Sequence, residues 1–229
     1  MLAEAVAARL AKIRARIERA GGDVERVRVL AVTKGFGPEA VRAASASALL
    51  DVGENYAAEL LEKSGRLAAA ADLEGAPPRW HFLGAVQRNK VGALAPVVSC
   101  WQSVARLSEG EAIQRAAPGA RVLVQVDTTG RPGRNGVGPD AVPGLTGALR
   151  DVGLDVVGLM TVAPRPPDQA RAAFRAVGTL ADRLGLRERS MGMSDDLELA
   201  VAEGSTMVRI GRDLFGARPA RPALARTSR

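Results

Sequence analysis

The chain is poor in cysteine, histidine and aromatic residues, and these shortages exclude several classes of protein. Its 229 residues include one cysteine, Cys100, and one histidine, His81. The chain therefore forms no internal disulfide, and it has no cluster of cysteine, histidine and carboxylate residues at metal-site spacing. No run approaches the roughly 18 apolar residues of a membrane-spanning helix. A single thiol also suits a reducing compartment, so we expect a cytoplasmic protein that binds no metal and no membrane.

Aromatic residues make up only 3% of the chain, which bears on the meaning of its net charge of +7. A basic protein invites the hypothesis of nucleic-acid binding. Here, however, arginines are interleaved with acidic residues along the helical segments, and no aromatic residues alternate with them to stack on bases. We therefore expect no specific nucleic-acid partner. The stretch after Gly216 contains arginine but no acid, and we expect residues 218–229 to form a basic, disordered tail.

The chain is rich in alternating strand-like and helical periods. Apolar, β-branched runs that predict strands cover 27–33, 48–52, 80–83, 97–101, 122–126, 156–159, 189–191 and 207–210. Segments with helical periodicity cover 3–19, 39–47, 56–71, 87–94, 108–116, 141–150, 168–184 and 195–203. Ser108 and Glu111 have the spacing of a capping box at the start of one of these helices.

Eight strands alternating with helices predict an α/β fold with a parallel sheet, and a closed barrel is the economical arrangement at this length. We expect residues 1–217 to form a single (β/α)8 TIM-type barrel with an additional helix before the first strand. A doubly wound open sheet is the alternative, because the strand near 189–191 is indistinct.

One lysine stands at the end of the first predicted strand, where the active sites of such barrels lie. The apolar run 29–33 leads to Lys34, which is followed at once by Gly35. The lysine stem can lie on apolar surface while the ammonium reaches water. Alternatively, partial desolvation lowers the pKa of the lysine and makes it a nucleophile toward carbonyl groups. Spacing alone favours the first interpretation.

Residues near the last two strands favour the second interpretation. Ser194 precedes the predicted helix 195–203, where it can serve as the N-cap, as a ligand for an anion, or as both. Gly211 follows the eighth strand and lets the backbone approach closely. Arg209 lies within that strand, among apolar neighbours. Because barrels often bind phosphate with these two loops, a lysine nucleophile facing them has the layout of a pyridoxal phosphate site.

Other polar residues have simpler interpretations. We expect His81, between Trp80 and Phe82, to be a structural histidine rather than an acid-base catalyst, and Cys100 to be a buried small hydrophobe. The glycine-rich segment 128–139 lacks the Lys-Ser/Thr ending of a phosphate-binding loop. The sequence leaves open whether this segment acts as a lid.

Six blocks, in order along the chain, resemble the signature sequences of the pyridoxal phosphate homeostasis proteins, which are single-domain relatives of the alanine racemase barrel. The blocks are Ala31-Val32-Thr33-Lys34, Gly53-Glu54-Asn55-Tyr56, Trp80-His81-Phe82-Leu83-Gly84 with Gln87 and Asn89-Lys90, Gly158-Leu159-Met160, Met191-Gly192-Met193-Ser194-Asp195-Asp196, and Gly204-Ser205-Thr206-Met207-Val208-Arg209-Ile210-Gly211. They span nearly the whole chain, which makes the resemblance specific.

The resemblance implies pyridoxal 5'-phosphate as the cofactor, bound by Lys34 as an aldimine (a Schiff base). Ser194 and Gly211 become phosphate ligands, and Arg209 faces the pyridine nitrogen. At Arg212 many members have a threonine that helps to hold the phosphate, although the backbone N–H of Arg212 can still serve. The implied cofactor-binding residues are Lys34, Asn55, Ser194, Arg209, Gly211 and Arg212.

The resemblance also implies a protein of vitamin B6 homeostasis that carries and buffers the cofactor without substantial turnover. We expect it to be a monomer and to pass the cofactor to apo-enzymes. Arg209 would keep the pyridine nitrogen unprotonated, which weakens the ring as an electron sink. Larger racemases take a second acid-base group, a tyrosine, from an additional domain, for which this chain leaves no room, and Tyr56 is no obvious replacement. A slow pyridoxal-phosphate-dependent amino acid racemase is the alternative, and turnover of free amino acids would distinguish the two.

Overall fold

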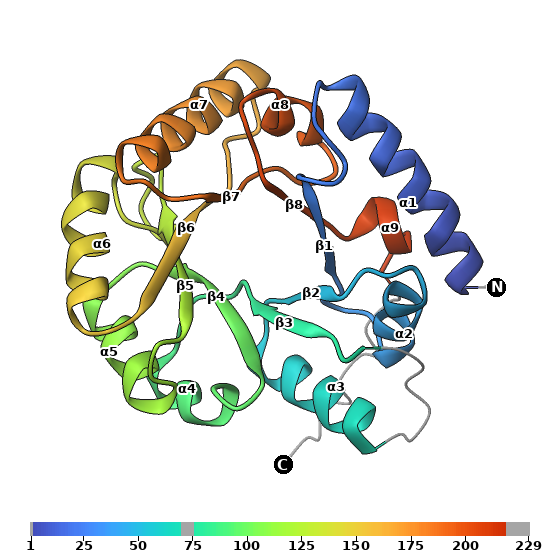
Figure 1. Cartoon of the computed structure of the whole chain (residues 1–229), viewed down its shortest axis with the longest axis horizontal. Coiled ribbons are helices and arrows are strands. Elements are labelled where there is room, and N and C mark those ends of the chain that lie inside the picture. The colour runs from blue at the N-terminus through green and yellow to red at the C-terminus, as the bar shows by residue number, and fades with distance from the viewer. Residues whose placement is uncertain (1, 70–75, 219–229) are drawn as a thin grey trace, which may run out of the picture.

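The structure is a computed structural model that describes residues 2–69 and 76–218. Within these residues, eight parallel strands follow one another around a closed barrel (Figure 1). The strands are β1 (Arg28–Val32), β2 (Asp51–Glu54), β3 (Arg79–Phe82), β4 (Val98–Val104), β5 (Arg121–Val126), β6 (Asp155–Thr161), β7 (Glu188–Ser190) and β8 (Met207–Ile210). The predicted (β/α)8 barrel is confirmed. The open-sheet alternative is wrong, because β1 pairs with both β2 and β8.

Helices surround the barrel and alternate with the strands along the chain (Figure 1). In α7, Ala170, Phe174, Val177 and Ala181 recur at helical spacing and are all buried, so the apolar face that predicts the helix is the face that packs. The helices are α1 (Leu2–Arg19), α2 (Pro38–Ala46), α3 (Ala57–Ala69), α4 (Arg88–Leu94), α5 (Leu107–Ala116), the 3-10 helix η1 (Pro139–Ala141), α6 (Val142–Asp151), α7 (Pro167–Arg183), α8 (Leu197–Ala202) and α9 (Arg212–Phe215).

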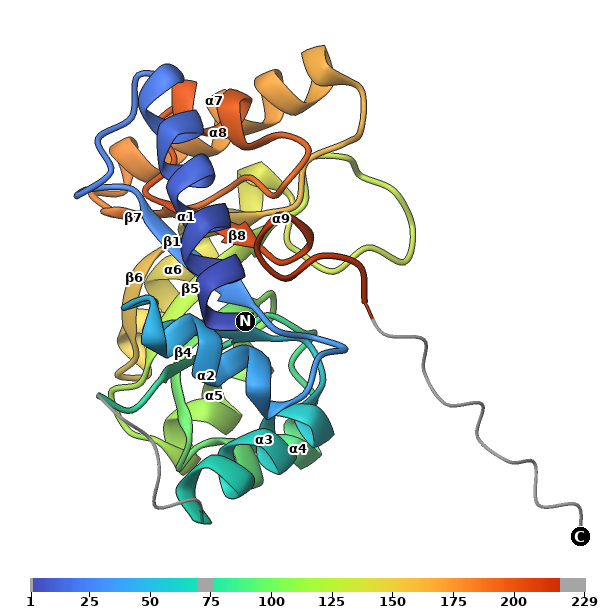
Figure 2. The ribbon, with the colours of Figure 1, turned by 90° about the vertical axis from the view of Figure 1, so that its right-hand side faces the viewer.

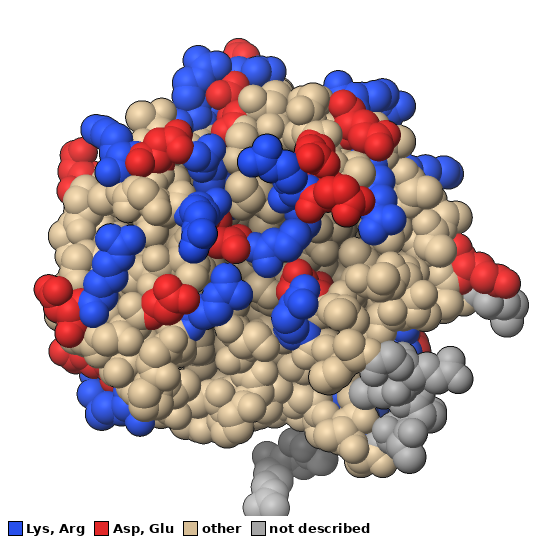
Figure 3. Space-filling view, in the orientation of Figure 1, with Lys and Arg blue, Asp and Glu red and all other residues tan. Residues whose placement is uncertain are grey.

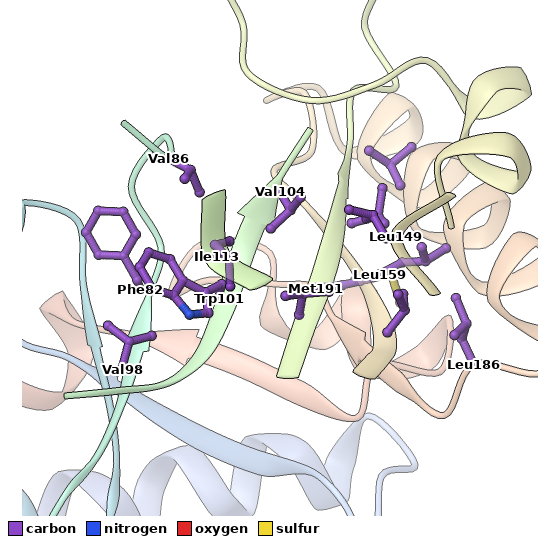
Figure 4. Packing of buried hydrophobic residues seen from close by; sticks show 14 of the residues in the cluster. Phe82, Val86, Val98, Trp101, Val104, Ile113, Leu149, Leu159, Leu186 and Met191 are labelled. Atoms are coloured by element: carbon purple, nitrogen blue, oxygen red, sulfur yellow. The ribbon is translucent and has the colours of Figure 1, made fainter. Parts of the chain in front are cut away.

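Most of the hydrophobic core lies between the strands and the helices (Figure 4). Trp101 of β4 is fully buried in this layer and meets Phe82 of β3 with ring centroids 5.7 Å apart. Cys100, one residue earlier, belongs to a separate cluster with Leu123 and Met160. Alternation along each strand therefore separates an outer apolar layer from the barrel interior.

Charged side chains close the amino-terminal end of the barrel. Asp51 accepts two hydrogen bonds from Arg79, at 2.7 and 3.0 Å, and Arg28 pairs with Glu188. Figure 3 shows acidic and basic side chains side by side across one face of the molecule, in keeping with the interleaved charges of the sequence. The first residues of six strands are charged, and we call this set the charged ring: Arg28, Asp51, Arg79, Arg121, Asp155 and Glu188.

The predicted N-terminal helix is confirmed as α1, which packs against α2, α8 and α9 (Figures 1 and 2). Its buried face consists of Val6, Leu10, Ile13 and Ile17. These side chains join the apolar cluster on the outer side of β1 and β8. The helix therefore covers the barrel where its first and last strands meet.

The second strand begins three residues later than the sequence predicts. Ala48 and Leu49 belong to the turn that ends α2, where Ala48 has a φ of 57° and the N–H of Leu49 donates to the carbonyl of Ala44 at 3.0 Å. Leu49 is buried because it packs beneath this turn, so its apolar character does not indicate a strand. The strand extends instead to Glu54.

The start of α5 also differs from the prediction. Its N-cap is Arg106, and Glu109 Oε2 accepts hydrogen bonds from the backbone N–H groups of Ala105 and Arg106, at 2.7 and 3.1 Å. The helix begins one residue before Ser108, so the capping box predicted at Ser108 and Glu111 is wrong. Glu109, two positions before Glu111, is the glutamate that accepts backbone N–H groups at the start of this helix.

No helix in the described residues is long and apolar enough to cross a bilayer. Of the predicted tail 218–229, only Arg218 lies within the described residues.

Candidate functional site

A cavity of about 460 Å³ opens at the carboxyl-terminal ends of the strands, a size within the roughly 300–1,000 Å³ of small-molecule sites. Apolar walls come from Phe36, Leu83, Met160 and Val162. The barrel brings together here residues that are far apart in sequence. All of the residues that the sequence predicted for the site line this cavity: Lys34, Asn55, Ser194, Arg209, Gly211 and Arg212.

Lys34 lies just beyond β1 and is half-buried. Its ammonium forms no hydrogen bond or ion pair with a residue in 2–69 or 76–218. Burial, followed by the positive charges of Arg218 and Arg209, lowers the pKa of Lys34, and nearby carboxylates only partly oppose this effect. A larger fraction of this lysine is therefore the unprotonated, nucleophilic amine than in water.

Lys63 of α3 is also buried, but its ammonium is engaged. Lys63 Nζ donates to Glu54 Oε1 at 2.6 Å and to the carbonyl of Thr33 at 2.8 Å, and Thr33 Oγ1 donates to the same Glu54 oxygen at 2.5 Å. Burial raises the pKa of Glu54, and the charge of Lys63 counteracts this. Since these bonds occupy Lys63, and since it does not line the cavity, it does not compete with Lys34 there.

Arg209 is buried at the cavity, and β6 and β7 hold its guanidinium. Nη1 donates to the carbonyl and hydroxyl oxygens of Ser190, at 2.5 and 2.9 Å, and Nη2 donates to the carbonyl of Thr161 at 2.7 Å. Burial lowers the pKa of Arg209 to about 10, which leaves the group cationic at neutral pH. The burial of Arg209 agrees with its apolar neighbours in the sequence.

A chain of hydrogen bonds runs from Arg209 through the barrel interior to the charged ring. Ser190 Oγ donates to Gln102 Oε1 at 2.6 Å, Gln102 Nε2 donates to His81 Nδ1 at 2.7 Å, and His81 Nε2 donates to Asp51 Oδ1 at 3.1 Å. Because arginine can only donate, this order fixes the orientation of the Gln102 amide and the tautomer of His81. We call these five residues the interior chain. His81 has the structural role that the sequence predicted.

The carboxylate at the far end of the interior chain is Asp51. Burial raises its pKa, but the hydrogen bond from His81 and those from Arg79 outweigh burial and hold the pKa below the usual range. The interior chain therefore ends on a stable anion, and both of its ends are charged.

Ser194 lies near a helix start, but not the one that the sequence predicted. α8 begins only at Leu197, because Asp196 Oδ1 accepts the N–H of Met193 at 2.6 Å and holds the preceding residues in a turn. Ser194 instead faces the first turn of α9, where its Oγ accepts the N–H of Asp213 at 3.4 Å. The N-cap role at α8 is wrong, whereas a role toward an anion agrees with the position of Ser194 in the cavity lining.

Gly211 stands between β8 and α9, against the end of β1. A Cβ atom at this position would lie 3.0 Å from the carbonyl oxygen of Val32. A larger residue would therefore push α9 away from β1. The close approach that the sequence indicated is present, and it brings the start of α9 to the cavity.

Two further arginines line the cavity mouth. Arg212 pairs with Asp195, and both side chains are largely exposed. Arg218 packs against Gly35, where a Cβ atom would lie 3.1 Å from Arg218 Cδ. The sequence analysis placed Arg218 in the tail, yet this residue is part of the cavity lining.

Other residues considered from the sequence lie elsewhere. Tyr56 is 55% exposed and does not line the cavity. Cys100 is buried as predicted. The segment 128–139 projects on the same side of the barrel as α9 (Figure 2), and it is attached at its base, where Asn135 Nδ2 donates to Gln125 Oε1 at 2.7 Å and to the carbonyl of Ser103 at 3.1 Å.

Sequence reasoning missed Gln102, Ser190 and Arg218. Gln102 carries a recognisable signal, because it is a polar residue in the mostly buried strand β4, two positions after the inward-facing Cys100. Ser190 carries little signal, because it is the only buried residue of the short strand β7. Arg218 carries none, because an arginine beyond the last helix has the same local sequence whether it folds back or not.

Comparisons with known proteins agree with one another. The family model for the N-terminal domain of alanine racemase matches residues 4–219. The pyridoxal phosphate homeostasis protein of Pseudomonas aeruginosa is 40% identical over 227 residues, which cover 95% of this chain and 96% of that protein. The corresponding protein of Deinococcus radiodurans is 41% identical over 219 residues, covering 92% and 99%. PipY of Synechococcus elongatus, solved with PLP bound, superposes with a TM-score of 0.78 at 30% identity, covering 92% of this chain and 100% of PipY.

Proposed function

The chain belongs to the family of pyridoxal phosphate homeostasis proteins and matches the family model for the N-terminal domain of alanine racemase, and we propose that it binds pyridoxal 5'-phosphate reversibly and buffers the supply of this cofactor. One observation carries the proposal. A single cavity combines a lysine of lowered pKa with a serine, a glycine and arginines suited to an anion. The bound PLP in the PipY structure agrees with this cavity chemistry.

The lining fits the chemical groups of the cofactor. When bound, pyridoxal phosphate supplies an aldehyde and an electron-withdrawing ring. Lys34 provides the amine that the aldehyde requires, and Asn55 would contact the cofactor beside it. Ser194, Gly211 and the backbone of Arg212 would hold the phosphate.

The charge of the lining also suits a dianionic phosphate. Among the described residues that line the cavity, Lys34, Arg209, Arg212 and Arg218 are basic, and Asp195 is the only acid. Asp195 is itself paired with Arg212. The cavity therefore has an excess of positive charge at the end of the barrel where the phosphate would lie.

The same residues favour carriage over catalysis. Arg209 can only donate, so it would keep a facing pyridine nitrogen unprotonated. None of the described lining residues is a tyrosine, a histidine or a cysteine. The only carboxylate of the described lining, Asp195, is paired with Arg212. The described lining therefore offers no unpaired acid-base group for the second proton transfer that racemisation requires. We therefore favour the carrier over the slow racemase.

We further propose that the protein acts as a monomer in the cytoplasm and passes the cofactor to apo-enzymes. The open cavity mouth suits release to another protein. A single cysteine, buried in the barrel, suits a reducing compartment.

Borohydride reduction of the pyridoxal-phosphate-loaded protein, followed by peptide mapping, tests the binding proposal. We expect the visible absorbance of the bound cofactor and a label on the peptide that contains Lys34. Both should disappear in Lys34→Ala. Lys90→Ala is the matched control, since Lys90 is an exposed lysine of α4. A label on Lys63 or Lys90, or unchanged labelling of Lys34→Ala, would contradict the assignment.

Incubation of the loaded protein with a panel of free amino acids tests whether the protein is a carrier or a slow racemase. We expect turnover near the uncatalysed background. Racemisation at enzyme-like rates would replace the carrier with the racemase.

A further inference from the structure

Arg16 of α1 joins three segments at the side of the cavity where the phosphate would bind. Its Nε and Nη2 donate to the two carboxylate oxygens of Glu198 in α8, at 2.6 and 2.8 Å. Nη1 donates to Asp213 Oδ2 in α9 at 2.6 Å. Nη2 also donates to the carbonyl oxygen of Ser194 at 2.9 Å. One guanidinium therefore connects the loop after β7 with the helix after β8.

This connection lies directly behind the candidate phosphate ligands. Ser194 Oγ faces the N–H of Asp213, and both residues are bonded to Arg16 through other atoms. Arg16 itself does not line the cavity. It acts on the cavity only through the two segments that it joins.

The chemistry of the contact requires arginine. The planar guanidinium of Arg16, with donors in fixed directions, binds four acceptor oxygens on three segments. The ammonium of a lysine cannot reach all four in this geometry. The hydrogen bond to Glu198 is the main reason that the pKa of Arg16 is raised, and the same bond lowers the pKa of Glu198. The side chain is only 22% exposed, so solvent screens these charge-assisted bonds incompletely.

We propose that Arg16 is a positioning residue for the phosphate, and that α1, although it lies outside the barrel, is part of the cofactor-binding apparatus. Arg16 holds the backbone of Ser194 against the first turn of α9, so that the two phosphate-binding segments keep their spacing in the absence of ligand. The inference rests on the proposed function.

The test compares two ligands that differ only in the phosphate. Affinities for pyridoxal 5'-phosphate and for pyridoxal are measured by absorbance titration of the parent, Arg16→Gln and Arg14→Gln. Arg14 is the matched control, an exposed arginine of the same helix. We expect Arg16→Gln to lose about tenfold in affinity for pyridoxal phosphate and less than about twofold for pyridoxal. Arg14→Gln should change neither.

Amide hydrogen exchange without cofactor provides a readout that does not depend on binding. Exchange in residues 193–196 and 211–213 should rise in Arg16→Gln and not in Arg14→Gln. An equal loss of affinity for both ligands, or an unchanged affinity for pyridoxal phosphate, would overturn the inference. If Arg16→Gln does not fold, Arg16→Lys decides, since it should fold and show the same selective loss. A parent that binds neither ligand would instead refute the proposed function.

Discussion

Two lysines near the mouth of the barrel, Lys34 and Lys63, have different electrostatic surroundings. Lys63 is bonded to a carboxylate and a carbonyl oxygen, whereas the neighbours that most affect Lys34 are the cations Arg218 and Arg209. The more buried lysine is thus the less suited to react with an aldehyde. The charges next to an amine, together with burial, determine which lysine is nucleophilic.

Arg218 gives a direct test of this electrostatic effect. A lowered pKa means that Lys34 loses its proton at a lower pH than a free lysine does. Removing a neighbouring positive charge in Arg218→Ala stabilises the ammonium, so the pKa of Lys34 should rise. The pH profile of reductive labelling by pyridoxal, which lacks the phosphate, should then move to higher pH. Arg218→Lys retains the charge and should leave the profile near that of the parent. An unmoved profile in Arg218→Ala would disprove the effect.

The interior chain leads to a prediction about Gln102. Gln102→Leu removes the partners of both Ser190 and His81 inside the barrel, and each unsatisfied buried group costs about 1–3 kcal/mol. The free energy of unfolding in urea should fall by at least this amount. The control is Gln169→Leu at an exposed position of α7, which should stay within about 0.5 kcal/mol of the parent. Equal stabilities of the two variants would mean that the interior chain of hydrogen bonds does not stabilise the barrel.

At the scale of helices and strands, Gly211 sets how closely α9 approaches β1. Gly211→Ala would place a methyl group 3.0 Å from the Val32 carbonyl oxygen and should displace the start of α9, which we propose to bind the phosphate. We expect weaker binding of pyridoxal phosphate together with a modest loss of stability. Gly147→Ala in α6 meets no atom within 4 Å and should stabilise the helix by roughly 0.5–1 kcal/mol. Calorimetry and titration of both variants check the contrast. If Gly211→Ala binds as tightly as the parent, the close approach is not required.

The elements that the sequence predicted are those with a local cause. Periodicity predicted α1, because an amphipathic segment has only one face to bury. The alternation of strands and helices, together with the chain length, predicted the barrel. Leu49 was misassigned to a strand, since burial beneath a helix-ending turn selects the same apolar residue as a strand does. The start of α8 was misplaced because Asp196, rather than Ser194, accepts the hydrogen bond that forms the turn. In both places the boundary of the element depends on which of several nearby acceptors binds a backbone N–H group.

The candidate site divides in the same way. Lys34, Ser194 and Gly211 sit at strand ends, and a barrel brings all strand ends to one edge, so their meeting could be predicted. The role of Arg16 could not be predicted, because its partners Ser194 and Asp213 lie near the other end of the sequence. Within its own helix, Arg16 is only one more arginine beside the apolar face. Contacts that connect distant elements leave almost no local signal.

At the scale of the whole molecule, Cys100 can report opening of the barrel. It lies in the interior cluster with Leu123 and Met160, and burial raises the pKa of its thiol to about 12. Because the thiolate is the nucleophile that attacks thiol reagents, and because Cys100 is buried, the native protein should react only when the barrel opens. Pyridoxal phosphate should slow the reaction further, since a ligand of the folded state adds to its stability. It should give no such protection to Lys34→Ala. Rapid modification of the parent without denaturant would contradict this expectation.

The joint between β7 and β8 has a consequence for how the barrel holds its ligand. These strands share one register pair, Ser190 with Met207, and the hydroxyl of Ser205 adds hydrogen bonds to the carbonyls of Met191 and Met207 at 2.8 and 3.1 Å. Ser194 follows β7 and Gly211 follows β8. A phosphate bound by both residues would therefore connect the two strands across the joint that has the fewest register pairs. Release of the cofactor would then also lower the stability of this joint.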